Sequence, residues 1–126
     1  MPKSLQPDRK QALQRGSAAE ARALDYLQQQ GLSLIEQNFS CRWGEIDLIM
    51  REVQTLVFVE VRQRSSKLFG GAAASVGAGK QARMWHTAEY YLQSKGLAAG
   101  RMPPCRFDLI AIDGEQLSWI KDIISH

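Results

Sequence analysis

Three acidic residues stand where the surrounding sequence is apolar. Glu20 lies on the apolar face of a helical pattern, four residues before Leu24. Asp47 lies within the run GEIDLIM, and Glu60 lies within the run LVFVEV. Carboxylates are rarely buried without a compensating cation. If the three side chains converge, they would form an oxygen shell suited to a hard divalent ion such as Mg²⁺.

Such an ion can generate a hydroxide nucleophile and neutralise the charge of a phosphate, and a nearby cation can stabilise the transition state. Each acidic residue also has a purely structural interpretation. Glu20 could mark the boundary of the helix face, and Asp47 could face solvent from a one-sided sheet. Glu60 could form a surface ion ladder with Arg62, an arrangement that stabilises little.

A helix and three strands must position these residues. The helical pattern runs from about Asp8 to Gln30, and Gly31 ends it. Strands follow at 32–38, 44–50 and 55–64, joined by turns at 39–43 and 51–54, which favours an antiparallel meander. Strand alternation places two sets of side chains on opposite faces of the second strand, namely Glu45, Asp47 and Ile49 against Ile46, Leu48 and Met50.

The second half of the chain predicts one more helix and two more strands. Residues 65–79 are rich in glycine, alanine and serine, which indicates a mobile loop. A helix is expected from about 76 to 95, and strands at 106–112 and 115–123 around an Asp-Gly turn. The order predicts an α/β fold with a mixed central sheet flanked by helices. We expect residues 1–7 to be a flexible tail and residues 8–126 to be a single domain.

Composition restricts the classes of protein. The chain has 126 residues, 44% of them hydrophobic, and a net charge of +3, which leans slightly toward an anionic partner such as nucleic acid. We expect no contact with a membrane, because no apolar run approaches the roughly 20 residues that a span requires. The polar N-terminus does not resemble a secretory signal. Cys41 and Cys105 fit no zinc spacing, so we expect reduced thiols in a cytoplasmic protein.

The ordered set of motifs resembles the YraN-like bacterial family, which is itself similar to Holliday-junction resolvases of the PD-(D/E)xK nuclease superfamily. The match runs from about Gly16 to Ile120. It is carried by Gly16-xxx-Glu20, Tyr26-Leu27, Asn38, Arg42, GEIDLI (44–49), FVEVRQR (58–64), Lys80-xx-Arg83 and RFDLIAI (106–112).

The resemblance implies a restriction-endonuclease-like core and a role for each acidic residue. Asp47 and Glu60 correspond to ligands of Mg²⁺ or Mn²⁺, and Glu20 corresponds to the helix-borne acid of the resolvases. Arg62 stands where the superfamily has lysine. Arginine is larger and stays protonated, so Arg62 could orient water or stabilise phosphate charge but is poorly suited to act as a base. Lys80 could supply a substitute ammonium, or it could be an ordinary solvated lysine.

Basic residues surround these positions in the sequence. Phosphate contacts need such charges, although they carry no sequence information. A scattered solvated surface is the alternative. Trp43, Trp85 and Trp119 fit a core or an interface better than a base-stacking role. The candidate nucleic-acid-binding set is Arg42, Arg64, Lys67, Lys80 and Arg83.

Three functions are consistent with these residues. The leading one is a metal-dependent endonuclease that acts on branched or otherwise structured DNA, with Glu20, Asp47, Glu60 and Arg62 as the catalytic set. The second is a nucleic-acid-binding module of the same fold without cleavage activity, which Arg62 favours. The third is a non-enzymatic interaction protein, for which a homodimer is the simplest assembly.

Overall fold

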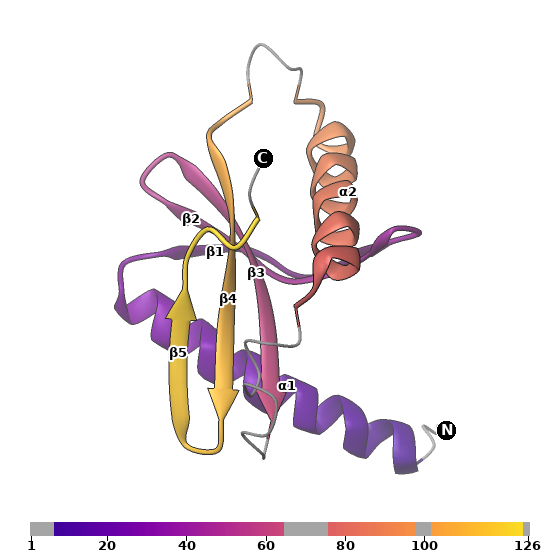
Figure 1. The fold of residues 1–126 in the computed structure, drawn as a ribbon, viewed down its shortest axis with the longest axis vertical. Helices are drawn as coiled ribbons and strands as arrows, with labels where there is room; N and C mark the ends of the chain where they lie inside the picture. The colour runs from indigo at the N-terminus through magenta and orange to yellow at the C-terminus, as the bar shows by residue number, and fades with distance from the viewer. Residues whose placement is uncertain (1–6, 65–75, 98–101, 125–126) are drawn as a thin grey trace, which may run out of the picture.

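The predicted order of elements matches the architecture of the chain, shown in Figure 1 as a computed structural model. The structure describes residues 7–64, 76–97 and 102–124, without the side chains of residues 7–17 and Arg64. Residues 1–6 of the expected tail and residues 65–75 of the expected mobile loop lie outside this part, whereas Pro7, expected in the tail, begins α1. The elements are α1 (Pro7–Gln29), β1 (Ser33–Cys41), β2 (Gly44–Glu52), β3 (Thr55–Arg64), α2 (Ala78–Ser94), β4 (Cys105–Asp113) and β5 (Gln116–Ile120).

The five strands form one mixed sheet in the order β1-β2-β3-β4-β5. The first three strands form the predicted antiparallel meander. β3 then pairs with β4 in parallel, from Leu56 opposite Cys105 to Arg64 opposite Asp113, and α2 lies in the connection between them. A parallel pair requires such a crossover because its strands cannot be joined by a tight turn. β5 returns antiparallel to β4.

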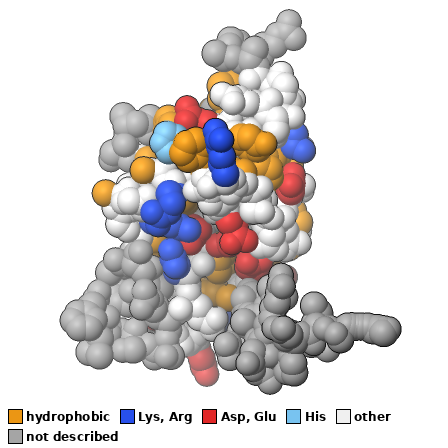
Figure 2. Space-filling model, turned by 90° about the vertical axis from the view of Figure 1, so that its right-hand side faces the viewer, with side chains coloured by type: hydrophobic (Ala, Val, Ile, Leu, Met, Phe, Trp, Pro, Cys, Tyr) orange, Lys and Arg blue, Asp and Glu red, His pale blue; other side chains and the backbone are white. Residues whose placement is uncertain are grey.

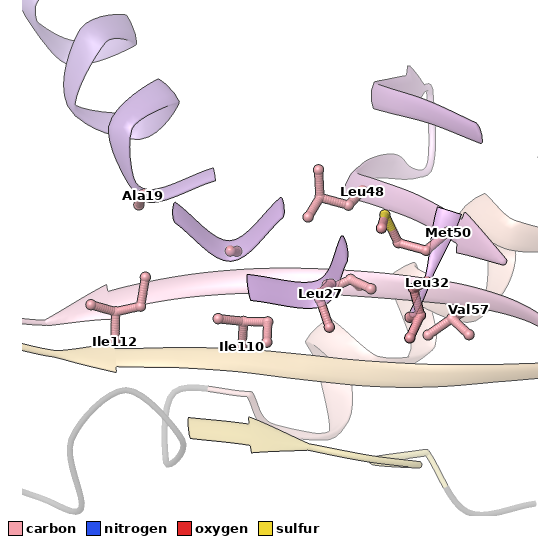
Figure 3. Close-up of a cluster of buried hydrophobic side chains, with 10 residues drawn as sticks. Ala19, Leu27, Leu32, Leu48, Met50, Val57, Ile110 and Ile112 are labelled. Atoms are coloured by element: carbon pink, nitrogen blue, oxygen red, sulfur yellow. The ribbon is translucent and has the colours of Figure 1, made fainter. Parts of the chain in front are cut away.

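Each face of the sheet packs against one helix. On one face, a stripe of Ala19, Ala23 and Leu27 from α1 covers side chains of β2, β3 and β4, as Figure 3 shows. On the other face, Met84, Ala88, Tyr91 and Leu92 of α2 pack on a second buried cluster that contains Phe58. This arrangement is an α/β fold compatible with a restriction-endonuclease-like core.

The boundaries of three strands differ by two residues or more from those expected, and one of the three is β5, which ends at Ile120 and not at residue 123. β1 continues through Cys41, so that the turn to β2 consists of Arg42 and Trp43 alone. β2 likewise continues to Glu52, where we expected a turn. In both cases residues expected in a turn, such as Ser40 in β1 and Glu52 in β2, pair with the neighbouring strand instead. The hydrogen bonds that this strand offers cannot be seen in the local composition.

The alternation expected along β2 is wrong at Ile46. This side chain packs in the cluster beneath α2 with Ile49, whereas Leu48 and Met50 pack beneath α1. The cause lies in β1, where Asn38 has a φ of 55° in the left-handed region that asparagine tolerates. The pairs on either side of Asn38 are formed, but Asn38 and Asp47 are not paired in the ladder. The hairpin turns there, and Ile46 changes face.

Two contacts outside the sheet fix α1. The guanidinium of Arg22 donates to the backbone carbonyls of Gly114 and Glu115, in the turn between β4 and β5. The T-shaped contact between Tyr26 and Trp119 of β5, with centroids 6.2 Å apart, lies one helical turn further along. These contacts set the rotation of α1, and therefore the direction in which Glu20 points.

The described helices offer no span long and apolar enough to cross a membrane. Cys41 and Cys105 are both free, in agreement with the expectation of reduced thiols.

Asp108 forms a buried ionic cluster that the sequence analysis did not predict. Its side chain is fully buried in β4 and accepts the Nε–H of Arg106 at 3.1 Å. It also accepts the indole N–H of Trp119 at 2.9 Å and the backbone N–H of Asp122 at 3.0 Å. Arg106 reaches on to Glu52 of β2, 2.6 Å away. The cluster connects β4, β5 and the segment after β5 with the end of β2.

We expect Asp108→Ala to lower the free energy of unfolding by about 3–5 kcal/mol, because the substitution leaves the Trp119 indole and the Asp122 amide without their acceptor and Arg106 with Glu52 alone. Urea denaturation measures the change. Glu115→Ala, at an exposed acid in the adjoining turn, is the control and should change stability by no more than about 0.5 kcal/mol. A loss below about 1 kcal/mol for Asp108→Ala would show that the cluster does not hold the strands together.

Candidate active site

Asp47 lies where two strands of the sheet part. The antiparallel ladder between β2 and β3 ends at the pair Leu48–Val59. One residue beyond, the Oδ2 atom of Asp47 accepts the backbone N–H of Val61 at 2.8 Å. The carboxylate therefore takes the place of a strand carbonyl, because Val61 would otherwise have an unpaired N–H at this point. The hydrogen bond fixes the side chain across the gap between the strands.

Glu60 is the buried acid of the site. It is only 4% exposed. It follows Phe58 by two residues on β3 and therefore shares the face of the sheet that α2 covers. Its Oε2 atom lies 3.0 Å from the Nε of Arg62 and 3.3 Å from the Nζ of Lys80. Glu60 is therefore not part of an exposed ion ladder, because one partner comes from a different element and the carboxylate is enclosed.

Lys80 reaches Glu60 from the first turn of α2. Its side chain is 22% exposed, so the residue is not the ordinary solvated lysine that was one alternative. The helix begins at Ala78 after Gly77, and its first turn contains no acidic residue. Because Lys80 lies in this first turn, the positive end of α2 is on the side of Glu60. An ammonium is present at the site even though β3 carries arginine.

Glu20 approaches the same carboxylates from the opposite helix. It is half-buried at the edge of the apolar stripe of α1, close enough to Asn38 and Asp47 for both side chains to influence its pKa. Asn38 is thus a site residue whose contribution the sequence did not reveal. Its backbone is left-handed, and its side chain lies near Glu20 and opposes the rise of that residue's pKa. Asn38 was part of the family resemblance, but the sequence did not reveal its place beside Glu20.

The protonation of the three acids reflects their crowding. The pKa of Glu60 is raised to about 7, first by burial and then by the charge of Asp47, while Lys80 and Arg62 limit the rise. Burial also raises the pKa of Asp47, opposed first by the Val61 N–H and then by Lys80. Burial and the neighbouring Asp47 raise the pKa of Glu20. Adjacent carboxyl groups that resist ionisation create a demand for additional positive charge.

The donor set fits a hard divalent ion. Within the described residues, no three acidic, histidine or cysteine side chains form a ready-made metal cluster. Mg²⁺, however, is usually held by one or two carboxylates together with water and substrate phosphate. Asp47 and Glu60 are adjacent and offer this minimum, and Glu20 stands next to Asp47. An ion bound there would have to share Glu60 with two cations of the protein.

The predicted basic residues do not all enter this arrangement. Lys80 does, whereas Arg42 and Arg83 are exposed on the same side of the molecule, in the β1–β2 turn and on α2. Lys67 and the side chain of Arg64 lie outside the described part of the chain. Figure 2 shows Lys and Arg side chains next to a group of acidic side chains on this face.

A protein-family model decides the relationship of the chain to known proteins. The model described as "Uncharacterised protein family UPF0102" matches residues 19–112. The chain belongs to the UPF0102 family. The YraN-like resemblance read from the motifs is thereby confirmed. The matched segment includes Glu20, Asp47, Glu60 and Lys80, so the whole candidate site lies within the UPF0102 region.

Individual UPF0102 proteins are similar over most of their length. The UPF0102 protein of Janthinobacterium sp. (strain Marseille) is 55% identical over 109 residues, covering 86% of this chain and 85% of the relative. The one from Nitrosomonas europaea is 53% identical over 113 residues, with coverage of 86% and 91%. The one from Shewanella loihica is 50% identical over 108 residues, again covering 86% and 91%.

The raised pKa of Glu60 predicts a pH-dependent stability. Between the ordinary pKa of 4.5 and about 7, folded Glu60 holds a proton that the unfolded chain has lost. The free energy of unfolding in EDTA should therefore fall as the pH rises through this window, by up to about 3 kcal/mol from this group.

Glu60→Gln should flatten this dependence, whereas Glu115→Gln, at an exposed acid, should leave it unchanged. Urea denaturation at fixed ionic strength from pH 4.5 to 8 measures the slopes. Equal slopes for Glu60→Gln and the unmodified protein would contradict the raised pKa.

Proposed function

We propose that this UPF0102 protein is a metal-dependent endonuclease that hydrolyses phosphodiester bonds in branched or otherwise structured DNA. The observation that carries the proposal is the pair of adjacent, desolvated carboxylates, Asp47 and Glu60, with an ammonium and a guanidinium within 3.3 Å of Glu60. The preference for branched DNA rests on the resemblance of the motifs to those of Holliday-junction resolvases.

Comparison with Asp108 supports a demand for an external cation. Asp108 is fully buried, but side-chain and backbone N–H groups of the protein saturate it. Asp47 accepts the N–H of Val61, and its side-chain neighbours include two further carboxyl groups, those of Glu20 and Glu60. A purely structural acid is expected to resemble Asp108. The clustering of acids at Asp47 is instead typical of a site that binds a cation.

The acidic residues would bind the metal ion, and the basic residues would stabilise the phosphate. Asp47 and Glu60 would hold the divalent ion, which when bound supplies charge neutralisation at the phosphate and a more acidic water. Asp47 is kept in position by the Val61 N–H. Arg62 cannot release its proton, so it would contribute charge stabilisation and not proton transfer. Lys80 would donate to the phosphate or to the attacking water. Glu20, beside Asp47, would complete the acidic shell.

We expect Asp47→Asn to reduce cleavage at least about a hundredfold, because the amide is nearly isosteric but a poor ligand. The fold should remain intact, and DNA affinity should be equal or higher because a negative charge near the phosphates is lost. Cleavage of labelled four-way junction and linear DNA with Mg²⁺ or Mn²⁺ measures the effect. Residual activity of Asp47→Asn equal to that of the unmodified protein would indicate a contaminating nuclease.

Substitutions can distinguish the role of Lys80 from that of Arg62. If Lys80 supplies the ammonium that the superfamily carries on β3, Lys80→Met should abolish cleavage, and adding Arg62→Lys should restore it in part. Arg62→Lys alone should at least maintain the rate. Lys95→Met, which removes a lysine paired with Glu36 at the far end of α2, is the matched control. Failure of the double variant to recover any activity would contradict the substitution of one ammonium by the other.

A nucleic-acid-binding module without cleavage is the second candidate. The occupation of Glu60 Oε2 by both Arg62 and Lys80 favours it, because two protein cations already neutralise that carboxylate. The unmodified protein would then bind branched DNA without cutting it in either metal, and Arg62→Lys would also be inactive. Arg62→Ala would weaken binding and reduce its salt dependence.

A further inference from the structure

A hollow separate from the carboxylate site lies on the outer face of α2. Its volume is about 330 Å³, and its walls come from the β1–β2 turn and from α2. The lining residues are Arg42, Trp43, His86, Glu89, Tyr90 and Gln93. None of them belongs to the proposed catalytic set. Figure 2 shows this face, with exposed hydrophobic side chains and a histidine between Lys and Arg side chains.

Two aromatic rings in this hollow are exposed. Trp43 is 42% exposed and Tyr90 is 46% exposed, although both could bury considerable apolar area. The Trp43 ring contacts the imidazole of His86, with centroids 5.1 Å apart and planes tilted by 36°. The guanidinium of Arg42 lies 5.1 Å from the centroid of the same ring. The indole is therefore supported by planar groups while a large part of it remains open.

The turn that carries Trp43 is held firmly against α2. Gly44 has a φ of +143°, and a Cβ at this position would lie 3.4 Å from the hydroxyl of Thr87 and 3.9 Å from Cβ of Arg83. Thr87 is itself fully buried and donates to the carbonyl of Arg83 at 2.7 Å. The backbone next to Trp43 thus runs close against α2, which places the ring beside this helix.

The hollow and the carboxylates lie along one path. Trp43 precedes Asp47 by four residues of an extended strand, which corresponds to about 13 Å. On α2, Lys80 contacts Glu60, and Arg83, His86 and Tyr90 follow it at intervals of three or four residues. Such intervals place side chains along one side of a helix. A chain of phosphates bound at the carboxylates could therefore continue past Arg83 toward Trp43.

We propose that Trp43 is the stacking platform of a site for an unpaired nucleobase, next to the phosphodiester that binds at Asp47 and Glu60. Every base has a π-face that can stack on an exposed indole. The positive charges of Arg42 and Arg83 suit the adjoining phosphates, whereas Glu89 and Gln93 can contact polar edges of a base. Glu89 is paired with His86 and would repel phosphate, so the backbone would lie on the side of the arginines.

This inference rests on the proposed function for the course of the phosphates. It specifies the substrate further, because duplex DNA keeps its bases stacked on one another. A base free to reach Trp43 exists at a flap, at a single-stranded end or at a branch point that contains unpaired bases.

The test compares two ligands of equal charge. One is a labelled duplex with a single-stranded thymine tail, and the other is the same duplex with an abasic tail of the same number of phosphates. In EDTA, at fixed low salt, the full chain should bind the thymine tail about fivefold more tightly or better. Fluorescence anisotropy measures both affinities. Equal affinities of the unmodified protein for the two tails would overturn the inference without any variant.

Variants assign the preference to the ring. Trp43→Ala should abolish the preference by weakening binding of the thymine tail alone, and Trp43→Phe should retain most of it. Val53→Ala, at an exposed apolar residue in the β2–β3 turn, is the control and should change neither affinity. Persistence of the preference in Trp43→Ala would overturn the inference. The inference would also be overturned if the unmodified protein were a dimer, Trp43→Ala a monomer, and the preference for the thymine tail the same in both. Trp43 would then serve a dimer interface.

The outcome is distinguishable from that of the proposed function. A protein that cuts junctions with Mg²⁺ but does not distinguish the two tails would retain the nuclease proposal and exclude the base site. A protein that prefers the thymine tail but never cuts would retain the base site and favour the binding module.

Discussion

The separation of β2 from β3 is the constraint on which the candidate site depends. If the ladder continued past Leu48 and Val59, the sheet would close over the space in which the acids meet. Because it stops, the N–H of Val61 needs another acceptor, and the Asp47 carboxylate provides it. The same opening lets Glu20 approach from α1 and Lys80 from α2. One interrupted ladder thereby brings side chains from both helices and both strands to one point.

The acidic and basic side chains at the candidate site nearly balance in charge, but the positive charges lie closer to Glu60 than to Asp47. Glu60 is enclosed and would ionise poorly without cations, while Arg62 and Lys80 supply two that bear on one oxygen. Asp47 is adjacent and receives less direct compensation. The protein thus neutralises one carboxylate largely with its own side chains and leaves the cluster of acids around the other under-compensated. A ligand that brings positive charge would relieve this imbalance, and a phosphate would find the two cations already in place.

The sequence predicted the elements and the principal acids because their signals are local. Apolar runs define β2 and β3, and an acid within such a run stands out, as Asp47 and Glu60 do. The contact of Lys80 with Glu60 could be considered but not established, because the residues between them determine where α2 begins. The face of Ile46 was mispredicted, since one left-handed residue in the neighbouring strand changed it.

Asp108 shows the limit of the same signal. It is an acid in the apolar run RFDLIAI, as Asp47 is in GEIDLIM, yet its charge is satisfied by Arg106, Trp119 and a backbone amide. A buried acid in a strand therefore does not distinguish a structural ion pair from a metal ligand. The distinction depends on which donors the fold brings near, and those come from residues distant in the sequence.

The parallel pairing of β3 with β4 has a consequence for the order of folding. The meander forms from neighbouring segments, whereas Glu60 pairs with Leu109, 49 residues away, after the whole crossover has been placed. Contacts of such long range form slowly because a large loop must close first. Glu20, Asp47 and Glu60 are all made before β4 leaves the ribosome. The acids therefore belong to segments that can pair before the sheet is complete, and β3 acquires its second neighbour beside Glu60 only when β4 docks.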